Sequence, residues 1–274
     1  MCTIGAVFGR NGDTLFFKNL DQVGGAPFPE PEIRKGTTYD YLHLGTSLRP
    51  ESTGVWAGVN EAGLVVLGAD GNCLLNHVGN QYASLDASLE AYREVLETQD
   101  SLLGAVGHLV DFYEGRKVGG DGDIILVGQR GQAVAMEYTL NRWGIEFSGD
   151  RDYMVRTNFF QVMRHIRPPS DENSLHLSSA LRHQRVRELL SRRSDETTMA
   201  DVFAMLRDHA HGPSAMSVCR HGGRHEYRTC CSLVVRLAEG EAEIYTLVNS
   251  PPCEGQYERR RMTLQSLRAG VTGG

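Results

Sequence analysis

The sequence predicts an α+β fold, a four-layer αββα sandwich in which two antiparallel sheets face each other and helices cover their outer faces. Short apolar runs separated by turn residues fall in three blocks, and two stretches with helical periodicity separate these blocks. No internal repeat, low-complexity tract or linker divides the 274 residues. We therefore expect a single domain over residues 1–274.

The first predicted element is a β-hairpin. Residues 4–8 and 14–18 are rich in apolar and β-branched side chains, and Asn11-Gly12-Asp13 joins them. An Asn-Gly pair between two such runs is a strong hairpin signal. Residues 24–36 contain three prolines and show no periodicity, which predicts a long loop after the hairpin.

Periodicity predicts the remaining elements in order. Strands are expected at 41–47, 54–59 and 63–69, and two helices follow from Ser84 and from Asp100 onward. Short runs at 123–128, 132–137, 143–147 and 153–157 predict a second antiparallel sheet. Helices at 177–190 and 199–209 and strands at 214–219, 228–236 and 243–248 complete the expected elements.

Composition and charge exclude several classes of protein. Hydrophobic residues make up 41% and charged residues 23%, which is typical of globular domains. The net charge of −6 argues against nucleic acid or an anionic membrane surface as a partner. The apolar runs are far shorter than the roughly 20 residues of a membrane span, and no secretion signal is visible. With six scattered cysteines, we expect a cytoplasmic protein.

Cys2 is the first candidate catalytic residue. It follows Met1 directly, and its small side chain permits removal of the methionine, which would leave a thiol and a free α-amino group on one residue. A thiol is nucleophilic, and an α-amine with a pKa of about 7.7–8.0 can accept its proton near neutral pH. We expect a single chain that begins at Cys2, without a propeptide.

Five separated segments carry a resemblance to known enzymes. In chain order they are Met1-Cys2-Thr3, Lys18-Asn19-Leu20-Asp21, Gly58-Val59-Asn60-Glu61-Ala62-Gly63-Leu64, Val155-Arg156-Thr157-Asn158 and Tyr227-Arg228-Thr229. They resemble the choloylglycine hydrolase and penicillin V acylase group of N-terminal nucleophile hydrolases. Residues 214–221, 229–232 and 251–254 look more like the related acyl-coenzyme A:6-aminopenicillanic acid acyltransferase branch, and the resemblance implies the N-terminal nucleophile hydrolase fold.

The resemblance also implies roles for individual residues. Asp21 would hold the α-amino group of Cys2, and a carboxylate there would stabilise the ammonium that forms when the thiol is deprotonated. Lys18 stands where the family usually has Arg, so it keeps a positive charge near the thiolate without the planar guanidinium. Asn158 would donate to the oxyanion of the tetrahedral intermediate, and Arg228 would orient Asp21 and the thiolate.

The resemblance also implies a second oxyanion donor, which is usually an Asn in the family, but the corresponding residue here is Asp70. An ionised carboxylate cannot donate this hydrogen bond. Three alternatives stay open: the backbone N–H at this position donates, Asn72 takes over, or Asp70 binds a cationic group of the substrate.

A metal site and a phosphate-binding loop are two alternatives to the N-terminal cysteine site. Cys219-Arg220-His221, His225, Cys230-Cys231 and the segment 208–211 contain ligand types, but they lack the paired spacing of common zinc motifs. The glycine-rich segment 119–122 follows a predicted helix and lacks a following Lys-Ser/Thr. We therefore expect no metal and no cofactor. Arg259-Arg260-Arg261 is interpreted as the solvated end of an element.

The resulting functional hypothesis is an amidohydrolase that cleaves a linear, non-peptide carboxamide of a small molecule through a thioester on Cys2. The alternative is an acyltransferase that passes the same acyl group to an amine or a hydroxyl. A non-catalytic binding relative is disfavoured by the joint presence of Cys2, Asp21, Asn158 and Arg228. Association with further copies of the chain stays open.

Overall fold

The structure is a computed structural model of the chain. It describes residues 1–24, 27–45, 53–71, 81–116, 122–139, 142–165, 173–192, 197–222 and 227–265, without the side chains of 81–86 and 173–174. In these residues, none of the helices is long and apolar enough to cross a membrane.

A six-stranded antiparallel sheet contains the N-terminus. Its order is β10-β1-β2-β11-β12-β13. The strands are β1 (Cys2–Phe8), β2 (Thr14–Val23), β10 (Tyr153–Arg156), β11 (Tyr227–Ala238), β12 (Glu241–Val248) and β13 (Glu258–Thr263). The predicted hairpin is confirmed as β1 and β2, with Gly12 in the turn at a φ of 82°.

A five-stranded antiparallel sheet faces the first one, with the order β5-β6-β7-β8-β9. Its strands are β5 (Ala57–Val59), β6 (Val65–Asp70), β7 (Asp123–Gln129), β8 (Gln132–Thr139) and β9 (Arg142–Phe147). A separate two-stranded ribbon joins β3 (Glu32–Arg34) to β4 (Tyr41–His43). The strand β3 lies inside the segment that the prolines predicted as a loop.

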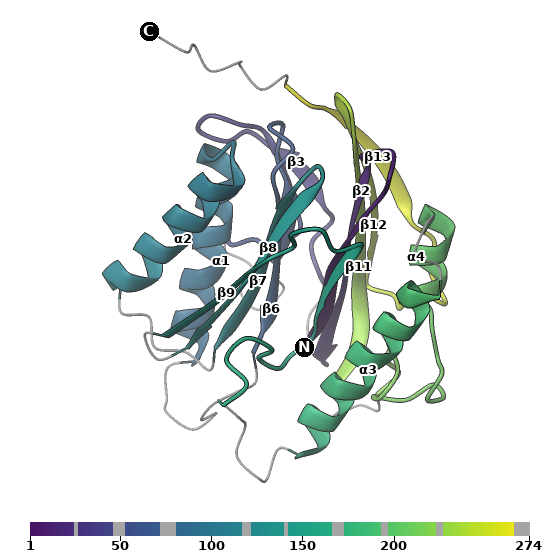
Figure 1. Cartoon of the computed structure of the whole chain (residues 1–274). Coiled ribbons are helices and arrows are strands. Elements are labelled where there is room, and N and C mark those ends of the chain that lie inside the picture. The colour runs from purple at the N-terminus through teal and green to yellow at the C-terminus, as the bar shows by residue number, and fades with distance from the viewer. Residues whose placement is uncertain are drawn as a thin grey trace, which may run out of the picture.

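Helices cover the outer face of each sheet (Figure 1). The helices α1 (Gln81–Thr98) and α2 (Leu102–Arg116) pack on the five-stranded sheet, and α3 (Asn173–Ser191) and α4 (Met199–Leu206) pack on the six-stranded sheet. The predicted αββα sandwich is therefore confirmed.

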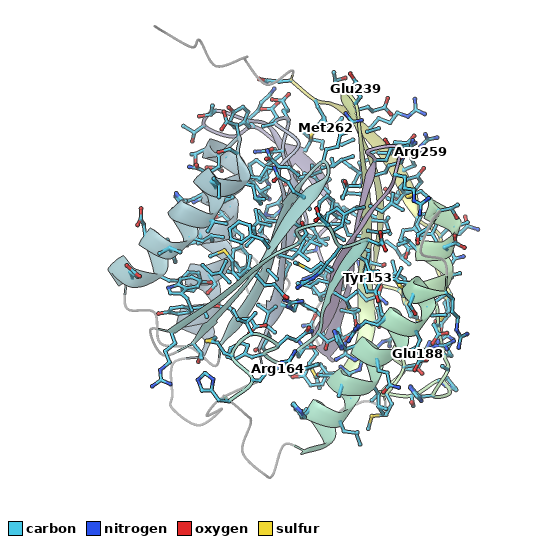
Figure 2. All side chains as sticks on the ribbon, in the orientation of Figure 1. Tyr153, Arg164, Glu188, Glu239, Arg259 and Met262 are labelled. Atoms are coloured by element: carbon cyan, nitrogen blue, oxygen red, sulfur yellow. The ribbon has the colours of Figure 1, made fainter. Side chains whose placement is uncertain are left out.

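Side chains fill the space between these layers (Figure 2). The strand β1 shows how alternation distributes them: Ile4 and Ala6 join the core between the sheets, whereas Val7 joins the core beneath α3 and α4. Cys2 has the same parity as Ile4 and belongs to the core between the sheets. The nucleophile candidate is thus directed toward the second sheet.

Gly5 allows three strands to approach closely in the middle of the six-stranded sheet. A Cβ at this position would lie 2.3 Å from Cζ of Phe17 and 2.6 Å from the carbonyl oxygen of Met154. Any larger side chain would collide with backbone on β10, so this position requires glycine.

Three further predictions of the elements need correction. The strand β10 was expected in the second sheet, but it pairs with β1 in the first sheet. Residues 214–219 form turns, because hydrogen bonds such as Ser217 Oγ to Gly212 O (2.7 Å) close the segment on itself. The arginines at 259–261 belong to the edge strand β13, where Arg259 and Arg261 pair with glutamates of β12.

Candidate active site

The β1–β2 hairpin brings Cys2 and Asp21, two of the predicted catalytic residues, close together. Cys2 opposes Leu20, and the pairing extends one residue further, since Asp21 N donates to the carbonyl oxygen of Met1 (2.7 Å). The terminal amino group of Met1 donates to the carbonyl oxygen of Asp21 at 2.8 Å. Cys2 is 1% exposed and Asp21 3% exposed, so both lie in a low-dielectric interior.

Lys18 lies directly beside the Cys2 thiol. Its Nζ is 3.5 Å from Sγ, and it also donates to the carbonyl oxygen of Gly68 on β6 of the facing sheet. The ammonium lies 5.2 Å from the ring centre of Trp56. Burial lowers the pKa of Lys18, and the neighbouring Cys2 opposes this effect. A thiolate at Cys2 would stabilise the buried lysine as an ammonium, and the ammonium would stabilise the thiolate.

Asp21 is held by three side chains. Thr229 Oγ1 donates to Oδ1 at 2.7 Å, and Arg220 Nη1 lies 3.3 Å from Oδ2. Arg182 Nη1 lies 3.7 Å from the same oxygen. Thr229 faces Asp21 because the two residues are partners in the β2–β11 register. A buried carboxylate with two guanidiniums is consistent with a fixed anion at the end of the hairpin.

Arg182 connects the helix α3 to the start of β1. It donates to the carbonyl oxygen of Cys2 (2.8 Å), to Oγ1 of Thr3 (2.8 Å) and to Oδ1 of Asn158 (3.0 Å). Burial lowers the pKa of Arg182 to about 10, and Asp21 opposes this shift. The group is therefore still charged at neutral pH, and it fixes the backbone of the cysteine.

Asn158 lies two residues after the end of β10, and its side chain reaches both Cys2 and the second sheet. Its Oδ1 accepts from Cys2 N at 2.8 Å, and its Nδ2 donates to the carbonyl oxygen of Asp70 at 2.6 Å. The following turn is anchored by Glu137, whose carboxylate accepts backbone N–H groups of residues 161–163 at 2.7–3.2 Å. The structure thus brings Cys2, Lys18, Asp21 and Asn158 together.

Arg228 does not occupy the position expected for it. It is exposed, and it opposes Gln22 in the β2–β11 register, one residue beyond the Asp21–Thr229 pair. Because successive side chains of a strand point to opposite faces, Thr229 is directed toward the cluster and Arg228 away from it. Within the described residues, no hydrogen bond or ion pair joins Arg228 to Asp21, and Arg182 and Arg220 make these contacts instead.

Asp70 is the last residue of β6 and is half-buried. Its backbone carbonyl oxygen, not an N–H group, faces the amide of Asn158. Asn72, the alternative second oxyanion donor, lies outside the described residues.

Sequence reasoning missed Arg182 and Arg220. Arg182 lies four residues before Val186 on the buried face of α3, so the helical period could have identified it as an arginine at a core position. Arg220 lies in the segment that was considered for metal binding, and nothing in its spacing indicated a contact with Asp21. Thr229 was part of the quoted motif without an assigned role.

Three buried basic side chains lie in the cluster with Cys2 and Asp21. Arg182 and Arg220 are buried guanidiniums, Lys18 is a buried amine beside the sulfur, and Asp21 supplies one carboxylate. A thiolate at Cys2 would offset part of this positive charge, as it does beside cationic groups in reactive cysteine sites. The arrangement can therefore activate a nucleophilic sulfur for attack on a carbonyl carbon.

A comparison with protein-family models identifies the family. The model described as acyl-coenzyme A:6-aminopenicillanic acid acyl-transferase matches residues 5–250. The chain belongs to this acyltransferase family. The family resemblance inferred from the sequence segments is thereby confirmed, and the chain is an enzyme of an amidohydrolase or acyltransferase group.

Solved structures resemble this acyltransferase-family chain in fold. Two variants of the conjugated bile acid hydrolase from Clostridium perfringens superpose with TM-scores of 0.54 and 0.53, at 13% and 14% identity, covering 98% of this chain and 100% of theirs. The Caenorhabditis elegans orthologue of N-acylethanolamine-hydrolyzing acid amidase gives a TM-score of 0.51 at 14% identity, covering 85% and 92%. At such identities the likeness confirms the N-terminal nucleophile hydrolase fold. No curated protein matches the sequence.

Proposed function

We propose that the protein is a cysteine-nucleophile amidohydrolase that cleaves a linear, non-peptide carboxamide through a thioester acyl-enzyme. The observation that carries the proposal is the contact of Cys2 Sγ with Lys18 Nζ at 3.5 Å, at the end of a hairpin whose other strand supplies Asp21. Membership of a family of acyl-transferring enzymes supports the same chemistry.

The proposal includes removal of Met1, because the chemistry needs a base next to the thiol. With Met1 attached, the nitrogen of Cys2 is an amide that donates to Asn158 and cannot accept a proton. After removal, the same nitrogen is an α-amine in a cluster that contains the Asp21 carboxylate. The amine would take the thiol proton, and Asp21 would stabilise the resulting ammonium.

The first half-reaction forms a thioester. The sulfur attacks the acyl carbon of the amide, and the carbonyl oxygen takes up negative charge as a tetrahedral oxyanion. Asn158 Nδ2 carries two hydrogens, and the Asp70 carbonyl accepts one of them, so the amide is a candidate donor to this oxyanion. The C–N bond breaks, the ammonium of Cys2 returns its proton to the leaving nitrogen, and a free amine departs.

The second half-reaction determines the type of enzyme. Attack by water on the thioester releases a carboxylic acid and regenerates the thiol. Attack by an amine or a hydroxyl of a second substrate would give acyl transfer, and the description of the matching family favours this second candidate. Both candidates share the acyl-enzyme and differ only in the acceptor.

Product analysis by mass spectrometry separates these two candidates. The enzyme is incubated with a panel of aliphatic and aryl-acetyl carboxamides, with and without 6-aminopenicillanic acid as acceptor. Hydrolysis predicts equimolar acid and amine without acceptor, whereas transfer predicts a new amide and little free acid when the acceptor is present. Cys2→Ala should abolish both reactions, and Cys230→Ala, a matched half-buried cysteine, should retain them. Turnover that survives Cys2→Ala would contradict the proposal.

A further inference from the structure

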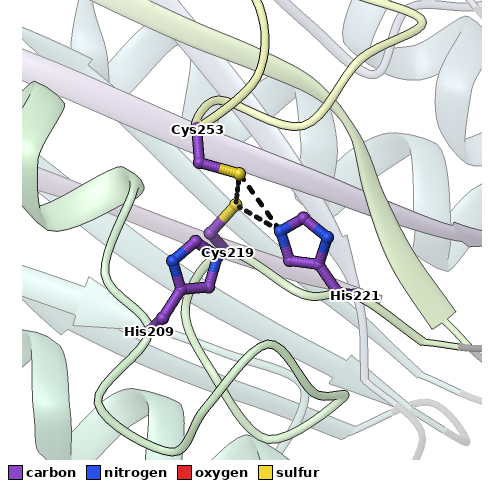
Figure 3. Close-up of side chains that lie close together, drawn as sticks. All are labelled: His209, Cys219, His221 and Cys253. Carbon is purple, nitrogen blue, oxygen red and sulfur yellow. Dashed lines mark hydrogen bonds between the residues drawn. The ribbon is translucent and has the colours of Figure 1, made fainter.

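Four histidine and cysteine side chains, residue types that can bind metals, lie close together outside the candidate active site (Figure 3). His209 follows α4, Cys219 and His221 lie in the segment that leads to β11, and Cys253 lies between β12 and β13. One potential ligand atom from each residue lies within 4.8 Å of all the others. The fold thus brings distant parts of the sequence together, since His221 and Cys253, whose side chains are in contact, are 32 residues apart in the chain.

The distances between these atoms approach those of a tetrahedral metal site. The two sulfurs are 3.5 Å apart, and His221 Nε2 lies 3.1 Å from Cys253 Sγ and 3.7 Å from Cys219 Sγ. Ligand bonds of about 2.0–2.3 Å give tetrahedral edges of about 3.3–3.8 Å around zinc. The S–S distance and the longer N–S distance lie within this range, and the 3.1 Å N–S distance is about 0.2 Å below it. The widest pair would need to close by about 1 Å.

The two histidines are also oriented for binding. Nδ1 of His221 lies 3.5 Å from Oε1 of Glu254, which leaves Nε2 directed at the two sulfurs. A carboxylate on the other ring nitrogen is the usual outer partner of a metal-bound imidazole. In His209, Nε2 is buried and has no hydrogen-bond partner among the described residues. A buried nitrogen without a partner costs stability, and a metal ion would satisfy its lone pair.

We propose that His209, Cys219, His221 and Cys253 bind one zinc ion in a closed tetrahedral site. Two thiolates and two imidazoles form a donor set that suits zinc. Four protein ligands leave no open position for a substrate, so the ion has a structural role. The sequence carried no signal for this site, because the four ligands do not occur as closely spaced pairs and only the fold brings them together.

The zinc ion would stabilise the segment that supplies Arg220 to the active site. Arg220 lies between the ligands Cys219 and His221, and its guanidinium is 3.3 Å from Asp21. Its backbone N–H donates to Thr229 Oγ1 at 2.9 Å. Binding of two flanking residues to one ion would restrict this segment, which otherwise consists of turns. Arg220 would then be a positioning residue whose geometry depends on the metal.

Metal analysis of the purified full chain tests the proposal. Protein is produced with added zinc, kept reduced, and analysed by elemental mass spectrometry, with about one zinc per chain expected. Cys219→Ser and Cys253→Ser should each lower the zinc content at least tenfold. The matched controls Cys230→Ser and His211→Gln, which change the same residue types outside the cluster, should retain the metal.

Binding of cobalt to the wild-type chain tests the same site without any variant, so it still applies if a ligand variant does not fold. Cobalt bound to two thiolates in a tetrahedral site should give sulfur-to-cobalt charge-transfer bands and intense visible absorption, and zinc should displace it. Less than about a tenth of an equivalent of metal after reconstitution would overturn the proposal. Zinc retained in both cysteine variants would also overturn it. So would a Cys219–Cys253 disulfide in protein that is freshly prepared under reducing conditions.

Discussion

Arg182 donates a hydrogen bond of 2.8 Å to the carbonyl oxygen of Cys2. The guanidinium comes from a helix on the outer face of the six-stranded sheet, yet it reaches the first residues of β1 and the amide of Asn158. The nucleophile candidate is therefore held from three directions: by β2, by the turn after β10 and by α3.

Replacement of Arg182 by lysine tests this arrangement. Lysine keeps the positive charge but cannot donate in parallel to Cys2, Thr3 and Asn158. Loss of one charge-assisted hydrogen bond of about 1.5–3 kcal/mol predicts a decrease in kcat/KM of about 10- to 100-fold. Steady-state kinetics checks this, with Arg187→Lys, an exposed site on the same helix, as the control. An unchanged kcat/KM would show that Arg182 does not position the nucleophile.

Replacement of Asp21 by asparagine should destabilise the fold as well as the site. The carboxylate lies between Arg182 and Arg220, and both guanidiniums are buried. Removal of one partner from a buried ion pair typically costs about 3–5 kcal/mol. Urea unfolding should show this loss, whereas Asp150→Asn at an exposed turn should change stability by less than about 0.5 kcal/mol. Equal midpoints for the two variants would contradict the assignment.

The folded protein should lose stability in acid because of His183. Burial, followed by the charges of Arg187 and Arg156, lowers its pKa to about 4. Between pH 6.5 and about 4, the unfolded chain binds a proton that the folded chain does not, so the free energy of unfolding falls as the pH falls through this window. The stabilisation is fully present above pH 6.5.

The lowered pKa of His183 sets the size of this loss of stability. The loss below pH 4 is about 2–3 kcal/mol for this partly accessible ring. His183→Gln should flatten the dependence of the free energy of unfolding on pH in urea titrations from pH 7 to 4. Parallel curves for wild type and His183→Gln would refute the assignment.

Two glycine substitutions should have opposite effects on stability. In Gly5→Ala the new methyl group would collide with the carbonyl oxygen of Met154, which belongs to a paired strand and cannot move aside. Overpacking of this kind costs about 1–3 kcal/mol. Gly107→Ala on the exposed face of α2 meets nothing within 4 Å, and it should stabilise the helix by about 1 kcal/mol. Thermal unfolding of both variants checks the two signs.

Local patterns predicted most elements but not every pairing. The Asn-Gly turn identified the β1–β2 hairpin, and helical periodicity identified α1 to α4. The pairing of β10 with β1 joins residues about 150 positions apart, as in Ile4 with Arg156, and no local signal specifies such a contact. The edge strand β13 was missed because its arginines suggested a solvated end, although charged side chains are common on edge strands.

The site was predictable where it followed strand register. Asp21 and Lys18 lie on β2 opposite the start of β1, so the hairpin alone brings them near Cys2. Arg228 was expected beside Asp21, but it opposes Gln22 on β2, where a shift of one position reverses the face. Contacts from α3 and from the segment before β11 depend on the packing of layers, which sequence spacing does not encode.

Trapping of the acyl-enzyme tests the central claim most directly. Active protein is mixed with a carboxamide substrate, quenched in acid within the first turnover, and analysed by intact mass and peptide mapping. The account predicts one acyl group as a thioester on the N-terminal peptide, which begins at Cys2, and no adduct in Cys2→Ala. An acyl group on any other residue, or an active protein that retains Met1, would contradict it.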